Sequence, residues 1–215
     1  LRGDKGQFFT PRELIKAMVR IANPKSGDKI VDPASGTGGF LVESFVHIKK
    51  NESKPEKNIG LLGLEKDEDI QRLGGAMLEI ATDGCGQISL TNSLDINEIS
   101  KLSPSPFNAD IVLTNPPFGS RIGVKDREIL KQYDLGHEWI FDQNNERWIQ
   151  QESLLVSQDP QILFLELGIK LLKPGGLLGI ILPEGMFGNK KSSYVWDFVL
   201  KNCEIEVLID CPRTT

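Results

Sequence analysis

Apolar runs recur along the chain and alternate with helix-like segments. A polar side chain lies at or just after the end of three of these runs, namely Asp32, Glu65 and Asn115. A fourth run, over 87–90, leads through a short, mostly polar segment to Asp95. Buried strands that alternate with helices predict an α/β fold with a doubly wound, mostly parallel sheet. Ligands bind such sheets beyond the carboxyl ends of the strands. The four polar residues are therefore expected at one site, although they lie in four separate segments.

Periodicity and chain breakers give the expected elements. Strands are expected over 29–32, 59–64, 87–90, 109–113, 177–182 and 204–210, and helices from Phe40 onward, over 160–172 and over 192–202. The polar stretch from Ser120 to Asp159 interrupts the alternation. The 215 residues are enough for one sizeable core and are expected to form one domain. The chain stops soon after an expected strand, so it is expected to be truncated before the last strand of its sheet.

The string Asn115-Pro116-Pro117-Phe118 directly follows an apolar run. The prolines fix their own φ and push the preceding residues into extended shapes. The Asn115 side-chain oxygen and the Pro116 carbonyl are then two aligned acceptors, which suit an exocyclic amino group. Phe118 adds a flat face on which a base can stack. The alternative is a strand followed by an ordinary proline turn.

A glycine turn follows the first strand, in the string Asp32-Pro33-Ala34-Ser35-Gly36-Thr37-Gly38-Gly39-Phe40. Gly36 and Gly38 permit positive φ and let a ligand approach the backbone closely. The string is not the dinucleotide pattern, and it lacks the Lys-Ser/Thr of a phosphate loop. Asp32 disfavours a phosphate and suits a cationic ligand instead.

Two further carboxylates have competing interpretations. Glu65 ends the second strand, where an acidic residue can accept both hydroxyls of a ribose. It also opens a charged run, which favours a solvated surface. Asp95 lies where it can accept from the amino group of an adenine ring, but an Asp after a strand is more often a turn or helix cap.

Thr10, Pro11 and Glu13 form a strong helix-start signal. Thr10 is the expected cap, Pro11 the first helical residue, and Glu13 completes a capping box. Two phenylalanines precede the cap, and spacing does not decide which of them packs as a staple and which lines a ligand site. The whole string is Gln7, Phe8, Phe9, Thr10 and Pro11.

Together these motifs resemble the catalytic core of DNA adenine methyltransferases, specifically the modification subunit of type I restriction–modification systems. The resemblance implies a Rossmann-like fold that uses S-adenosylmethionine. It implies that Asn115, Pro116, Pro117 and Phe118 hold the target adenine. It also implies that the cofactor is held by Gln7, Phe8, Phe9, Thr10, Pro11, Asp32, Ser35, Gly36, Thr37, Gly38, Glu65 and Asp95.

The implied reaction moves a methyl group to the 6-amino nitrogen of adenine. That nitrogen is a poor nucleophile, so in-line positioning is the main task of the protein. A paired base cannot reach such a site, so the base is expected to be flipped out of the duplex. A protein glutamine or cytosine amino group is an alternative target. A non-catalytic module that holds S-adenosylmethionine or DNA is the other alternative.

Charge and composition bear on partners. The net charge of -5 lacks the basic excess of a protein that grips phosphates alone. Double-stranded DNA is therefore expected to be recognised with a specificity subunit or domain, and a restriction subunit is a further expected partner. Arg121, Lys125, Arg127 and Lys131 form either a local basic patch or a solvated helix face.

The three cysteines, Cys85, Cys203 and Cys211, are widely spaced and fit reduced cytoplasmic thiols. His47 and His137 are isolated, so no metal site is expected. The chain has no apolar run of the roughly 20 residues that a membrane span needs, so no membrane association is expected.

Overall fold

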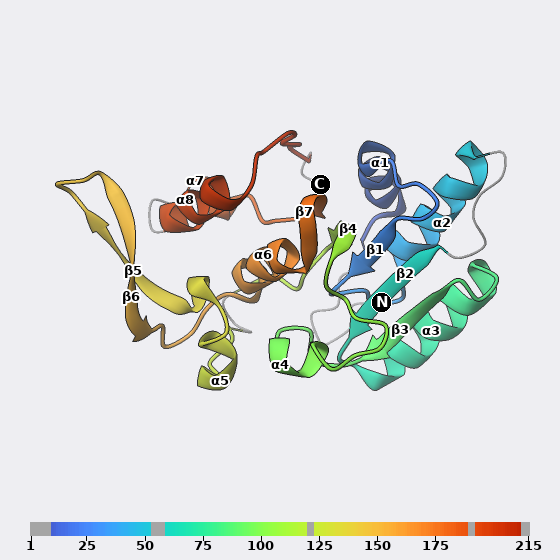
Figure 1. The fold of residues 1–215 in the computed structure, drawn as a ribbon, viewed down its shortest axis with the longest axis horizontal. Coiled ribbons are helices and arrows are strands. Elements are labelled where there is room, and N and C mark those ends of the chain that lie inside the picture. The colour runs from blue at the N-terminus through green and yellow to red at the C-terminus, as the bar shows by residue number, and fades with distance from the viewer. Residues whose placement is uncertain (1–9, 53–58, 120–122, 189–191, 212–215) are drawn as a thin grey trace.

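The computed structural model describes residues 10–52, 59–119, 123–188 and 192–211. Five parallel strands form its central sheet, in the order β3-β2-β1-β4-β7 (Figure 1). The strands are β1 (Lys29–Asp32), β2 (Gly60–Glu65), β3 (Gly86–Leu90), β4 (Ala109–Thr114) and β7 (Leu172–Ile180). The expected doubly wound, mostly parallel sheet is confirmed.

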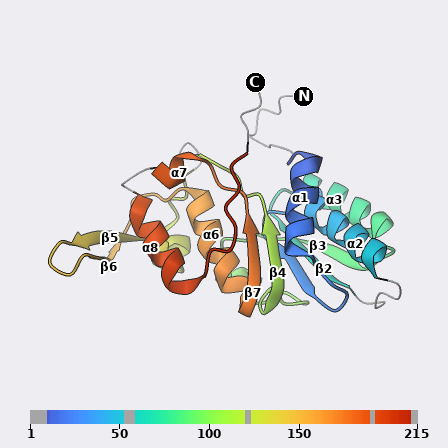
Figure 2. The ribbon, with the colours of Figure 1, turned by 90° about the horizontal axis from the view of Figure 1, so that it is seen from above.

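Helices cover both faces of this sheet. One face carries α1 (Arg12–Ala22), α2 (Gly39–Asn51) and α3 (Glu68–Ala81), and the other carries α4 (Ile96–Ile99) and α6 (Pro160–Leu171). Two further helices, α7 (Gly185–Gly188) and α8 (Ser193–Asn202), pack beside α6. Figure 2 shows the two layers on opposite sides of β4 and β7.

Side-chain alternation along β1 explains why its sequence is apolar throughout. Ile30 belongs to the core under α1 and α2, whereas the next residue, Val31, belongs to the core under α6. A strand covered on both faces buries successive side chains in two different layers. The carboxyl end of β1 is thereby held between two cores.

The polar stretch after Asn115 contains an antiparallel hairpin that the sequence did not predict. The hairpin consists of β5 (His137–Asp142) and β6 (Arg147–Leu154). It is preceded in the same stretch by α5 (Arg127–Leu130) and the 3-10 turn η2 (Asp134–Gly136). The hairpin projects away from the central sheet (Figures 1 and 2). Glu166 of α6, which is fully buried, anchors its base by accepting the amides of Asp134 and Leu135 at 2.8 and 2.7 Å.

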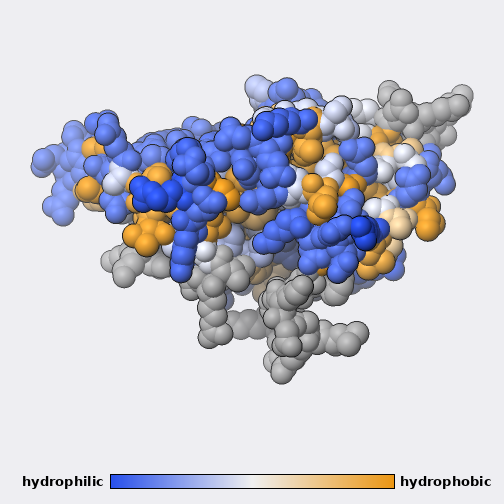
Figure 3. Space-filling view, turned by 90° about the horizontal axis from the view of Figure 1, so that it is seen from below, coloured by the Kyte–Doolittle hydropathy of each residue, from blue (hydrophilic) through white to orange (hydrophobic). Residues whose placement is uncertain are grey.

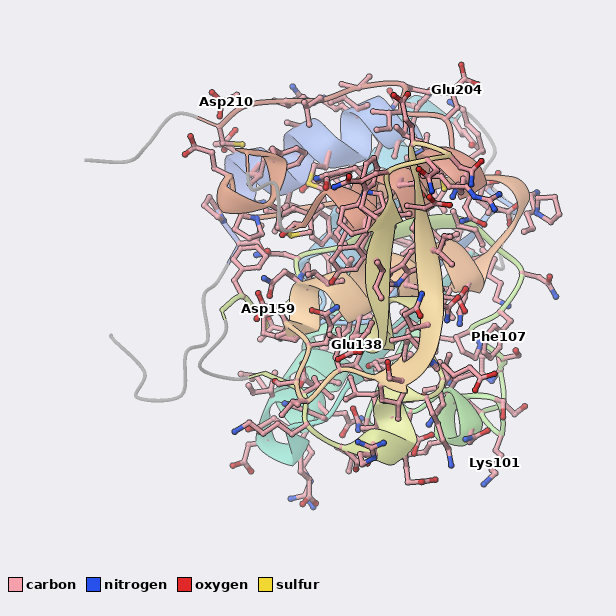
Figure 4. All side chains as sticks on the ribbon, turned by 90° about the vertical axis from the view of Figure 1, so that its left-hand side faces the viewer. Lys101, Phe107, Glu138, Asp159, Glu204 and Asp210 are labelled. Atoms are coloured by element: carbon pink, nitrogen blue, oxygen red, sulfur yellow. The ribbon has the colours of Figure 1, made fainter. Side chains whose placement is uncertain are left out.

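The expected strand over 204–210 is wrong. Residues 203–211 have no strand assignment, and their apolar side chains are exposed, Leu208 by 70%. In Figure 4 the stretch from Glu204 to Asp210 runs along the outside of the molecule. A strand needs a neighbour that completes its backbone hydrogen bonds, and local alternation alone does not supply one.

The start of α1 also differs from the expectation. Pro11 occupies the cap position with φ -55° and ψ 134°, and no side chain caps the helix. Glu13 pairs with Lys16 at 3.0 Å instead of closing a capping box. The Thr10 hydroxyl does not cap the helix, because it accepts a hydrogen bond from the Asn115 side chain at 2.9 Å.

Other boundaries moved by a few residues. The strand expected over 177–182 is β7 in the structure, and it runs from Leu172 to Ile180. It starts early because Leu172 already pairs with Ala109, before an irregularity in the pairing of β4 with β7. Asp159 and Pro160 start α6 as expected. Within the described ranges, no helix has the length and apolar character that crossing a membrane requires. Hydrophilic side chains dominate the face in Figure 3, and apolar ones gather there only in small groups.

Candidate functional site

The candidate site lies where the chain connections leave the sheet in opposite directions. From β1 the chain continues toward β2, and from β4 it continues toward β7, although β1 and β4 are neighbours. In open sheets of this kind, ligands bind at such a switch point, beyond the carboxyl ends of the strands, in the region known as the crevice. Asp32 is the last residue of β1, and Asn115 follows the last residue of β4. The predicted convergence of the strand-end residues therefore has its structural basis here.

The Asn115 side chain is tied down by one end of its amide. Its Nδ2 donates to the Thr10 hydroxyl at 2.9 Å. Its Oδ1 is buried and accepts no hydrogen bond from any residue that the structure describes. A buried acceptor without a donor costs free energy, so this oxygen suits a donor brought by a ligand. The sequence could not reveal the contact with Thr10, which is 105 residues away.

The rest of the turn has the burial that a base platform needs. Pro116 is buried and Pro117 is partly buried, so the backbone of the turn is held against the fold. The Phe118 side chain is 37% exposed and presents part of its ring to solvent. A fixed backbone that carries an accessible ring can stack a flat ligand.

The glycine turn after β1 packs against the end of β2. The Ser35 amide and hydroxyl both donate to the Leu64 carbonyl, at 3.0 and 3.2 Å. Gly36 and Gly38 have φ of +51° and +82°, which other residues rarely adopt. A Cβ on Gly36 would meet no atom of the described residues within 4 Å, so this part of the structure leaves space beside the Gly36 backbone that a ligand can occupy. Thr37 lies between the two glycines.

Glu65 connects the tip of β2 to that turn. Its Oε2 accepts from the Gly36 amide at 3.1 Å, and its Oε1 accepts from the amides of Lys66 and Asp67 at 2.8 and 2.9 Å. The side chain is partly buried. Glu65 is thus not only part of a solvated charged run, because its carboxylate holds the glycine turn against the end of β2. The carboxylate still has acceptor capacity for a ligand, because two oxygens can accept more hydrogen bonds than these three.

Asp32 is the most perturbed acid of the site. Its side chain is 1% exposed, and burial raises its pKa to about 7. The nearby Thr114 hydroxyl and the Ala34 amide, which is 3.0 Å away, offset part of that rise, whereas the Glu65 carboxylate adds to it. A cation beside Asp32 would favour the ionised form, because opposite charge lowers the pKa of an acid.

Asp95 performs the capping role that was the alternative to ligand binding. Its Oδ1 accepts from the Asn97 and Glu98 amides, at 3.1 and 3.3 Å, at the start of α4. Capping uses one of the two carboxylate oxygens. The contact of Asp95 with an adenine ring stays a prediction.

Sequence reasoning missed two glycines that let the crevice form. A Cβ on Gly74 of α3 would lie 2.8 Å from the Gly36 carbonyl oxygen. A Cβ on Gly63 of β2 would lie 2.7 Å from the Ser35 hydroxyl. Both permit the glycine turn to approach its neighbours closely. A glycine inside a strand or helix is the signal that could have found them.

Several predicted residues lie outside the described part of the chain, namely Gln7, Phe8, Phe9 and Arg121. The remaining basic residues of the proposed patch surround α5, where Lys131 pairs with Glu128 and Asp126 caps the helix. This mixed charge favours the solvated helix face. No group of three or more His, Cys, Asp or Glu side chains suited to a metal occurs among the described residues.

Residues 2–215 match the sequence family described as N-6 DNA Methylase. The chain belongs to the N-6 DNA methylase family. A curated member of similar sequence is the EcoEI methylase subunit of a type I restriction enzyme from Escherichia coli. It is 29% identical over 98% of this chain and 39% of its own length.

Solved structures agree with this membership. A modification subunit assigned to a type I restriction enzyme from Vibrio vulnificus YJ016 is 26% identical, with a TM-score of 0.67, over 93% of this chain and 39% of its own. A methyltransferase subunit of a type I system from Streptococcus thermophilus shares the fold, with a TM-score of 0.68 at 20% identity, over 93% of this chain and 40% of its own. This N-6 DNA methylase chain thus spans about two fifths of the length of these relatives.

Proposed function

We propose that residues 1–215 are the catalytic domain of a site-specific DNA adenine methyltransferase, the modification subunit of a type I restriction–modification system. The observation that carries this proposal is the Asn115 Oδ1, which is buried at the switch point and accepts no hydrogen bond from a described residue. The 6-amino group of adenine is a donor of the required kind. Membership of the N-6 DNA methylase family supports the same target.

The crevice fits S-adenosylmethionine as the cofactor. The open space in front of Gly36 leaves room for a ligand against the backbone, and Asp32 supplies the negative charge that a sulfonium and an ammonium group favour. The residues proposed to hold it are Gln7, Phe8, Phe9, Thr10, Pro11, Asp32, Ser35, Gly36, Thr37, Gly38, Glu65 and Asp95. When bound, S-adenosylmethionine supplies a methyl group activated by the positive charge of its sulfur.

The protein's own part in the reaction is positioning and acceptance of a proton. The Asn115 Oδ1 and the Pro116 carbonyl would accept hydrogen bonds from the amino group of adenine. These hydrogen bonds favour a more tetrahedral nitrogen, and the same acceptors can receive the proton that the nitrogen loses after methylation. Phe118 would stack on the flipped base, and Pro117 keeps the turn stiff. Correct placement of two reactants can supply several kcal/mol of the barrier reduction.

The proposed DNA substrate requires partners. With a net charge of -5 and mixed charges around α5, this chain is poorly suited to hold duplex DNA unaided. We therefore propose that a specificity subunit or domain recognises double-stranded DNA and that a restriction subunit completes the assembly. A DNA substrate and thiols typical of a reducing compartment support a cytoplasmic location.

Two other functions remain as alternatives. A non-catalytic module that binds S-adenosylmethionine or DNA would not need an amino-group acceptor, so the unsatisfied Asn115 Oδ1 disfavours it. A protein glutamine or a cytosine also carries an amino group that the motif could hold. The aromatic-Thr-Pro string ahead of the glycine turn favours adenine in DNA.

The test is transfer of labelled methyl groups to duplex DNA by the full-length protein with its specificity partner. We expect N6-methyladenine in the product, loss of transfer in Asn115→Ala with cofactor affinity retained, and loss of activity in Phe118→Ala through about 1–3 kcal/mol of lost stacking. Asn144→Ala, in the hairpin turn, is the matched control. Label in cytosine or protein, or equal loss of cofactor binding in both site variants, would contradict the assignment.

A further inference from the structure

The turn that carries Phe118 is hydrogen-bonded to the fold at both of its ends. At its start, Asn115 donates to Thr10 at 2.9 Å. At its end, the Gly119 amide donates to the Gln161 Oε1 at 3.3 Å. The ring that we propose as the base platform lies between these two attachments. The second attachment involves a residue outside the family motif.

Gln161 is a buried polar side chain in an apolar helix. It is 4% exposed, and the residues around it on α6 are buried as well. Its Nε2 donates to the Asp159 Oδ2 at 3.3 Å, so both ends of the amide are used. Asp159 lies at the start of α6, as Figure 4 shows. Burial of an amide is costly unless its hydrogen bonds are made, so these two contacts account for a polar residue here.

We infer that Gln161 is a positioning residue for the target base, because it fixes the end of the Asn115–Gly119 turn to α6. This inference rests on the proposed function of that turn. Gly119 has no side chain, and its φ of +114° lies outside the range that other residues prefer. Its backbone amide is therefore the group through which α6 can hold this end of the turn.

The expected consequence is a kinetic one. Pro116 and Pro117 stiffen the start of the turn, but they do not determine where the chain goes after Phe118. If the Gly119 amide is released, the Phe118 ring has more orientations to sample while the base is being stacked. A small loss of orientation lowers the rate of transfer without touching the cofactor.

The first experiment compares Gln161→Met with Thr82→Val in the full-length protein with its specificity partner. Met keeps the volume but removes both hydrogen bonds. Thr82, at the opposite end of the sheet, is also fully buried, and it donates to the Leu78 carbonyl at 2.7 Å. Its replacement controls for loss of one buried hydrogen bond. We expect Gln161→Met to lower kcat by about 3- to 10-fold, the scale of one hydrogen bond, with cofactor affinity unchanged and kcat of Thr82→Val unaffected.

The second experiment exchanges the roles of the two side chains. Gln161→Glu alone keeps an acceptor for Gly119 but faces the Asp159 carboxylate, so it should be impaired. The double variant Asp159→Asn/Gln161→Glu restores a donor opposite the new carboxylate and should recover most of the wild-type kcat. A DNA duplex with 2-aminopurine at the target position reports base flipping by fluorescence, and its signal should fall and recover in parallel with kcat.

The outcomes separate this inference from the function beneath it. Wild-type kcat and fluorescence in Gln161→Met, the same loss in Thr82→Val, or no recovery in the double variant would each overturn the positioning role while DNA methylation stands. A wild-type complex that methylates no adenine would overturn the proposed function, and the inference together with it.

Discussion

Asp32→Asn should stabilise the cofactor-free protein at neutral pH and weaken cofactor binding at the same time. Asp32 is 1% exposed, and burial raises its pKa to about 7 from an ordinary 3.8. The unfolded chain ionises this carboxyl at lower pH than the folded chain does, so the folded state loses stability as the pH rises from about 4 to about 7. One pKa unit corresponds to about 1.4 kcal/mol, so the full loss is about 4 kcal/mol.

The assay is chemical denaturation without cofactor at a series of values between about pH 5 and pH 8. The free energy of unfolding of Asp32→Asn minus that of the wild type should grow by about 1.4 kcal/mol per pH unit and level off near pH 7. Asn keeps an oxygen for the Ala34 amide, so the comparison isolates the ionisation. Asp83→Asn, which removes an exposed carboxylate after α3, controls for the change in net charge.

The reasoning would be refuted if the difference in free energy of unfolding between Asp32→Asn and the wild type stayed constant from about pH 5 to pH 8. It would mean that the folded protein ionises Asp32 as easily as the unfolded chain does, and that burial is not the dominant influence on this carboxyl. Calorimetry with S-adenosylmethionine supplies the second half of the test. Equal affinity of Asp32→Asn and wild type would remove Asp32 from the cofactor site.

Two further substitutions probe the crevice. Glu65→Ala should weaken S-adenosylmethionine binding by about 1–3 kcal/mol, because the carboxylate that holds the glycine turn, and that we propose binds the ribose, is lost. Calorimetry measures this, and unchanged affinity would contradict it. Gly74→Ala should cost about 1–3 kcal/mol of stability, because its Cβ would lie 2.8 Å from the Gly36 oxygen. Gly75→Ala on the same helix, whose Cβ would meet only Gln71 at 3.8 Å, should be neutral or stabilising, and equal melting temperatures of the two variants would refute the close-approach argument.

The sequence predicted the sheet and the meeting of its polar strand ends because both follow from local patterns. Asp32, Glu65 and Asn115 each end a buried run, and the geometry of parallel strands brings such ends to one edge. The glycine turn was equally visible, because positive φ at Gly36 and Gly38 is a local requirement. The ligand contacts of these residues remain predictions.

What the sequence could not predict depends on contacts between distant residues. Thr10 has every local feature of a helix cap, yet its hydroxyl binds Asn115 instead. The hairpin arises from a polar stretch, and its aromatic residues Trp139 and Trp148 pack on Tyr194 from a helix much later in the chain. Residues 204–210 alternate as a strand does, but no described strand pairs with them.

The pairing of β1 with β4 also constrains the order in which this protein can assemble. The Lys29 amide donates to the Asp110 carboxylate at 2.7 Å across 81 residues of sequence. Bringing such distant segments together costs loop entropy before any contact rewards it, whereas β1, β2 and β3 follow one another directly. During synthesis the segment with the glycine turn therefore leaves the ribosome first and can begin to pack early. The half that carries Asn115 and Phe118 joins it only after β4 has been made, so the crevice is a late product of folding.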